Sequence, residues 1–126
     1  MTNPNLAPKQ HLRQIGEALD NLQRQHHALL VQIARLEKIG ITNAAPYWRP
    51  DRVGNRTLLY LIHPSQHGRR QRDYIGKDLK KQKAALAAIG RFKQHAQLTH
   101  KAHRLQSRIA EIERAITDLH AEAIRT

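Results

Sequence analysis

Two long stretches of this chain repeat apolar side chains in alternating steps of three and four residues, and this spacing constrains the fold more than any other feature. The first stretch has one polar member, His26, and its apolar members are Leu12, Ile15, Leu19, Leu22, Leu29, Ile33 and Leu36. Such a repeat places every member on one side of an α-helix, which is the pattern of a coiled-coil seam. Pro8 suits a first helical turn and Gly40 suits a stop, so the sequence predicts a helix over residues 8–39.

The second repeat runs through the C-terminal part of the chain and is equally regular. Its members are Leu98, Ala102, Leu105, Ile109, Ile112, Ile116, Leu119 and Ala123. Asp78 is a typical N-cap, and the residues that follow it favour a helix. The sequence therefore predicts a second helix over about residues 78–124. Gly90 weakens this helix by up to about 1 kcal/mol and marks a position for a bend.

The segment between the two helices has the composition of β-structure. The run "RTLLYLI" is rich in aliphatic and aromatic residues, and "PSQHG" after it is a turn sequence. Together with "RRQRDYIG" they predict a hairpin with strands at about 57–63 and 69–75. The preceding "APYWRP" is a candidate for a short third strand, which Pro46 and Pro50 restrict to a sheet edge.

These elements predict a mainly α fold with a single domain over residues 1–126. Two long coiled-coil-type helices flank a small antiparallel β-hairpin or three-stranded sheet at about 46–76, and they fold back on each other as an antiparallel pair. Because the second helix is longer, its apolar end around Ile112, Ile116 and Leu119 lacks a partner, and this predicts a homodimer or higher homo-oligomer. The alternative is that the second helix is two helices, whose last part folds back within one chain.

The net charge of +12 is concentrated in the middle of the chain. Residues 49–83 carry ten Lys and Arg against three Asp, and residues 84–110 carry five Lys and Arg with no acidic residue. A localised positive field attracts a polyanion more strongly than a uniform basic coat does. The candidate nucleic-acid-binding residues are Arg49, Arg52, Arg56, Arg69, Arg70, Arg72, Lys77, Lys80, Lys81, Lys101, Arg104 and Arg108.

Three features of the predicted fold group these residues. Strand alternation places Arg70 and Arg72 on one face of the hairpin, and the start of the second helix offers free N–H groups to a phosphate. The last three candidates, from Lys101 onward, form a stripe at helical spacing beside the second seam. The alternatives are a solvated basic face, or a coiled-coil adaptor that binds an acidic protein partner.

DNA is favoured over RNA because a two-stranded ribbon fits the major groove of B-DNA, whereas the major groove of RNA is too narrow. An RNA-binding protein is the other nucleic-acid alternative. Tyr47 and Trp48 are candidates for stacking on a base, but a place at the tip or in the hydrophobic core is the simpler expectation. We expect Tyr74 to pack the hairpin against the second helix.

The sequence offers little support for an enzyme or a bound cofactor. There is no cysteine, no glycine-rich phosphate loop, no H-E-x-x-H and no nucleophile motif. Nine histidines raise the question of a metal, yet His100 and His103 have no carboxylate at matching spacing. We therefore predict a non-enzymatic protein without cofactor or metal. No apolar run spans a membrane and no secretory signal precedes Leu12, so we expect a cytoplasmic protein, nucleoid-associated when bound to DNA.

One segment resembles a known group of proteins. The run "LLYLIHPSQHGRRQRDYIGKDLKKQKAALAAIGRFKQHAQL" is similar to the strand–turn–strand–helix segment of small uncharacterised bacterial proteins carried on mobile elements. In those proteins a hairpin ending in YIGKD leads into a long helix, and the matching pieces here are Leu58–Ile62, Arg69–Asp78 and the helix that follows. The resemblance implies a plasmid, phage or transposon context and a DNA-linked role, and it supplies no catalytic residues.

Overall fold

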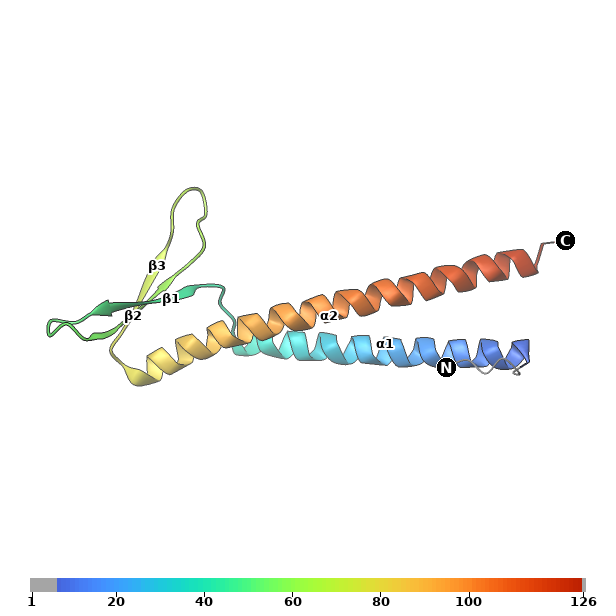
Figure 1. The fold of residues 1–126 in the computed structure, drawn as a ribbon, viewed down its shortest axis with the longest axis horizontal. Helices are drawn as coiled ribbons and strands as arrows, with labels where there is room; N and C mark the ends of the chain where they lie inside the picture. Colours follow the sequence, from blue (N-terminus) through green and yellow to red (C-terminus); the bar gives the residue numbers. More distant parts are fainter. Residues whose placement is uncertain (1–6, 126) are drawn as a thin grey trace. The chain divides into compact units, whose positions relative to one another are not determined.

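The computed structural model describes residues 7–125 and contains two α-helices and three β-strands (Figure 1). The order along the chain is α1 (Pro8–Ile39), β1 (Ala45–Pro50), β2 (Arg56–Ile62), β3 (Arg72–Gly76) and α2 (Leu79–Ala123). The expected fold class, two long helices flanking a small antiparallel sheet, is confirmed.

The helix ends follow the signals in the sequence. Pro8 is the first residue of α1, and Gly40 ends it with a φ of 121°, while its N–H still donates to the carbonyl of Leu36 at 3.0 Å. Asp78 caps α2, because its Oδ1 accepts the backbone N–H of Lys80 at 2.9 Å. The second helix is one continuous element of 45 residues, so the alternative of two shorter helices is wrong.

The three strands form an antiparallel meander in the order β1-β2-β3. The third strand expected from "APYWRP" is present as β1 and lies at an edge of the sheet, where proline is tolerated. The strand predicted at 69–75 is partly wrong, since β3 starts at Arg72. Arg69 and Arg70 therefore lie in the loop, and strand alternation does not place Arg70 beside Arg72.

The described residues group into two compact units. The sheet unit comprises residues 34–97, and the helical unit comprises residues 7–33 together with 98–125. In the helical unit the buried side chains belong to the two seams and include Leu29, Ala102 and Ile109. The half-buried His26 lies in the same seam as Leu29. The single-domain assignment stays a prediction.

The sheet unit buries a different kind of core. Leu59 and Leu61 of β2 are 0% and 6% exposed, and Ala44 before β1 is 4% exposed. Gln82 of α2 is 7% exposed, and its Nε2 donates to the carbonyl of Gly76 at 2.7 Å. The same nitrogen donates to the carbonyl of Thr57 at 3.0 Å. One amide group thus ties two strands to the start of α2.

The extra length of α2 lies at its beginning, and this corrects the expected register of the helices. Within the sheet unit, Arg91 donates to the carbonyl of Gly40 at 2.6 Å, which places the end of α1 level with the fourth turn of α2. Within the helical unit, Leu12 of α1 and Leu119 of α2 line the same groove. The last turns of α2 therefore have α1 as a neighbour.

Candidate nucleic-acid interface

Most of the net positive charge of the protein lies in the sheet unit. Residues 34–97 carry 14 Lys and Arg against 4 Asp and Glu, a net charge of +10. The rest of the chain carries 8 Lys and Arg against 6 Asp and Glu, a net charge of +2. All twelve basic residues singled out from the sequence are exposed. Nine of them, from Arg49 to Lys81, lie in the sheet unit.

The turn between β1 and β2 is organised by the carboxylate of Asp51. Its Oδ1 accepts the backbone N–H groups of Val53 at 2.9 Å and Asn55 at 3.0 Å. Its Oδ2 accepts the hydroxyl proton of Thr57 at 2.9 Å. The hydrogen bond from Thr57 is the largest cause that lowers the pKa of this carboxyl below its ordinary value. The ionised carboxylate therefore fixes the turn in which Arg52 is exposed.

Basic side chains lie at both ends of the middle strand and beside it. Arg52 precedes β2, while Arg69 and Arg70 lie in the loop that follows it. Arg49 of β1 pairs with Leu58 near one end of β2, and Arg72 of β3 pairs with Ile62 at the other. The seven residues of β2 span roughly 20 Å, which equals the rise of about six base pairs of B-DNA.

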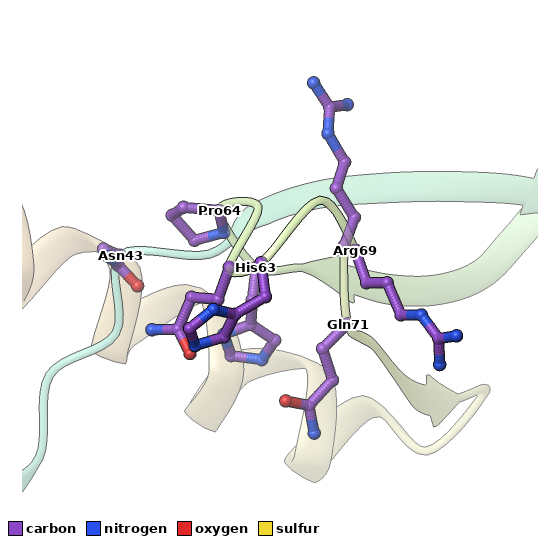
Figure 2. Close-up of a pocket in the computed structure, with 8 residues that line it drawn as sticks. Asn43, His63, Pro64, Arg69 and Gln71 are labelled. Atoms are coloured by element: carbon purple, nitrogen blue, oxygen red, sulfur yellow. The ribbon is translucent and has the colours of Figure 1, made fainter.

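The loop between β2 and β3 lines an open, polar cavity of about 460 Å³. Its lining residues are Asn43, His63, Pro64, Gln66, His67, Arg69, Arg70 and Gln71. His67 and Gly68 have φ values of 54° and 79° at the tip, as a type I′ turn requires. Figure 2 shows the side chain of Arg69 extending outward from the loop. His63 is also joined to Asp73 at 2.7 Å between Nε2 and Oδ2, which ties the base of the loop to β3.

A second cavity, of about 420 Å³, lies between the sheet and the start of α2 within the sheet unit. It is lined by Trp48, Asp51, Arg56, Thr57, Lys77, Leu79 and Gln82. Trp48 therefore lies on the side of the sheet that faces α2, as expected for a residue near the core. Arg56 and Lys77 reach this cavity from two different elements.

The start of α2 is less open to an anion than the sequence indicated. The N–H of Lys80 already donates to Asp78, so a carboxylate of the chain itself occupies part of the helix N-terminus. The exposed side chains of Lys80 and Lys81 remain available as cations. Their contribution to a phosphate site thus rests on the ammonium groups.

The stripe of Lys101, Arg104 and Arg108 belongs to the helical unit. All three side chains are exposed, and Arg108 forms an ion pair with Glu111 at 3.4 Å. The structure therefore brings nine of the candidate residues together in one unit and leaves these three in the other.

A row of tyrosines on the sheet was missed from the sequence. Tyr47 pairs with Tyr60, and Tyr60 pairs with Tyr74, so one tyrosine from each strand shares a single line across the sheet. We call these three residues the tyrosine row. The expectation that Tyr74 packs against the second helix is wrong, because this side chain is 62% exposed and its ring lies 5.0 Å from that of Tyr60. Only the strand register reveals the row, since the tyrosines are 13 and 14 residues apart.

Between residues 7 and 125, no group of three or more His, Cys, Asp or Glu side chains is placed to hold a metal ion. In the same part of the chain, no helix is both long and apolar enough to cross a membrane. No protein-family model, curated protein or solved structure matches this chain.

Proposed function

We propose that the protein is a non-enzymatic DNA-binding accessory protein whose sheet unit contacts the phosphate backbone. The observation that carries the proposal is the net charge of +10 on residues 34–97, with exposed arginines at both ends of β2. Arginine is the better bidentate phosphate ligand, and phosphate contacts supply most of the affinity of sequence-independent binding. The main phosphate contacts come from Arg49, Arg52, Arg56, Arg69, Arg70, Arg72, Lys77, Lys80 and Lys81.

The ordered turn and loop that carry arginines in the sheet unit support DNA as the partner. The turn at Asp51 and the loop at His63 are each held by hydrogen bonds to a carboxylate, so their arginines start from ordered backbone. Ordered contacts lose less conformational entropy on binding than a disordered basic tail does. The mobile-element context implied by the resemblance, and a cytoplasmic or nucleoid location, are part of the same proposal.

We also propose that the helical unit joins two copies of the chain. Leu12, Ile15, Ile116 and Leu119 are 52%, 42%, 39% and 55% exposed and line an apolar groove of about 370 Å³. A net charge of only +2 on this unit lets two copies approach with little repulsion, whereas two sheet units at +10 repel each other. A homodimer with two DNA-binding units also fits a two-fold symmetric site.

The test is a titration of the full chain against labelled duplex DNA, matched RNA and single-stranded DNA at several salt concentrations. Binding of DNA that persists near about 0.15 M salt, with a log–log salt slope of about −0.9 for each phosphate neutralised, is the expected result. A preference for RNA over both forms of DNA would replace the proposal with an RNA-binding function. Failure to bind any nucleic acid would leave the adaptor for an acidic protein partner as the better account.

A further inference from the structure

The tyrosine row lies on the face of the sheet opposite the buried core. Residues paired directly across antiparallel strands point to the same side, so Tyr47, Tyr60 and Tyr74 share one face. Successive residues of a strand point to opposite faces, and the two neighbours of Tyr60 in β2, Leu59 and Leu61, are both buried. The row therefore occupies the open face of the sheet unit.

Two rings of the row, those of Tyr60 and Tyr74, have close neighbours. The rings of Tyr60 and Tyr74 lie 5.0 Å apart at an interplanar angle of 49°, and Arg49 Cζ lies 5.6 Å from the centre of the Tyr60 ring. Gly76 has a φ of 89°, and a Cβ atom there would come within 3.3 Å of Tyr74 Cζ and Oη. The absence of a side chain at Gly76 thus makes room for the Tyr74 ring to lie against the backbone.

The outer surface of these rings is exposed to solvent beside cationic groups. Tyr74 is 62% exposed and Tyr47 is 45% exposed, although both contribute large apolar rings. Arg49 and Arg72 are the second neighbours of Tyr47 and Tyr74 along their strands, so they lie on the same face. Aromatic rings next to arginine are the usual surface on which nucleic-acid bases stack, and one base contributes about 1–3 kcal/mol.

The chemistry of this face suits unpaired bases better than the edges of an intact duplex. Reading of base edges in the major groove relies on Arg, Lys, Asn or Gln side chains that donate or accept hydrogen bonds. Beside the row the middle strand presents Leu58 and Ile62, and Arg49 lies over the ring of Tyr60. Ring faces can contact a base only where it is unstacked from its neighbours.

We propose that the tyrosine row is a stacking surface for unpaired bases, so that the preferred ligand is DNA with a single-stranded stretch. This inference rests on the proposed function, because the phosphates next to those bases are contacted by the arginines of the same unit. It narrows the proposed ligand from DNA in general to DNA with unpaired bases, such as single strands and tailed duplexes.

The experiment measures affinity for a single-stranded oligonucleotide, a tailed duplex and a blunt duplex, using the full chain and two variants. Tyr74→Leu keeps an apolar side chain near Gly76 but removes the ring, and Tyr74→Phe keeps the ring as the matched control. We expect Tyr74→Leu to weaken single-strand and tailed-duplex binding by roughly 5- to 100-fold, and blunt-duplex binding by less than about threefold. Tyr74→Phe should stay within about twofold of the parent, and the salt slope should be unchanged in both variants because no phosphate contact is lost.

A second readout places the contact on the ring itself. A fluorescent base analogue in the single strand should change its emission on binding to the parent and to Tyr74→Phe, and much less on binding to Tyr74→Leu. Equal affinities of all three proteins for single strands, or an equal loss on single strands and blunt duplex, would overturn the inference while leaving the proposed function standing. If the parent binds none of the three DNA forms, the proposed function itself fails, which is a different result.

Discussion

The sheet unit and the helical unit differ in the surfaces that they expose. The sheet unit combines a net charge of +10 with exposed tyrosines, whereas the helical unit combines a net charge of +2 with exposed aliphatic side chains at one end. A basic surface with aromatic rings suits a polyanion, and a nearly neutral aliphatic surface suits another protein surface. This difference in surface is why we propose a nucleic-acid partner for the sheet unit and a second copy of the chain as the partner of the helical unit.

The largest expected effect concerns the aliphatic surface of the helical unit. Leu119→Asp places a carboxylate in each half of the proposed dimer contact, which should raise the dimer dissociation constant by about 1,000-fold because a charge buried without a partner is strongly unfavourable. Val53→Asp, at an 84% exposed site in the sheet unit, is the control and should leave association unchanged. Sedimentation velocity over a range of concentrations measures both, and a monomeric parent chain would refute the dimer.

The next effect compares the basic residues of the two units directly. Substituting Arg69, Arg70 and Arg72 by Ala should weaken DNA binding by roughly 100-fold at low salt and reduce the salt slope by about 2–3. The matched triple variant Lys101→Ala, Arg104→Ala and Arg108→Ala removes the same charge from the helical unit. We expect it to stay within about threefold of the parent. An equal loss of DNA affinity in both variants would show that both units contact DNA.

A smaller effect concerns the stability of the sheet unit. Gln82→Met keeps the length of the side chain but leaves the carbonyls of Thr57 and Gly76 without the amide that they share, which should cost about 2 kcal/mol of unfolding free energy. Gln94→Met, at an exposed position of the same helix, should change it by less than about 0.5 kcal/mol. Urea unfolding followed by circular dichroism gives both values. Similar stabilities for the two variants would mean that the buried amide is not what ties the strands to α2.

The smallest effect is a pH dependence of the turn at Asp51. The pKa of this carboxyl is lowered in the folded state, so its stabilising contribution is present above the unfolded value of about 3.9 and is lost as the pH falls through the folded value. Asp51→Asn should therefore lower the midpoint of thermal unfolding at pH 6, and the difference from the parent should shrink near pH 3. A difference that is constant or grows on acidification contradicts this role of the carboxylate.

The helices were predictable because their signals are local. The observed bounds of both helices lie within one residue of the predicted bounds. The signals that predict them are the three-four repeat, Pro8, Gly40 and Asp78, and each depends on residues only a few positions apart. The start of β3 was not predictable in the same way. The run "RRQRDY" is polar enough for either a loop or an exposed strand, and only the pairing of Ile62 with Arg72 decides where the strand begins.

The candidate site was predictable in its charge but not in its geometry. Summing charges along the chain found the basic centre, because the sheet unit is continuous in sequence. The tyrosine row depends on strand register, including the irregularity between Leu59 and Tyr60, which no local pattern encodes. The register of α1 against α2 likewise depends on contacts between residues far apart in the sequence, so the expectation that the end of α2 around Leu119 lacks a partner was wrong.

The most direct test of the division between the two units is an NMR titration of the isotope-labelled full chain with DNA near about 0.15 M salt. Amide signals of residues 45–77 should shift in proportion to the DNA bound, whereas those of residues 98–125 should remain nearly unchanged. Shifts centred on Lys101, Arg104 and Arg108, with a silent sheet unit, would contradict the central claim that the sheet unit contacts the nucleic acid.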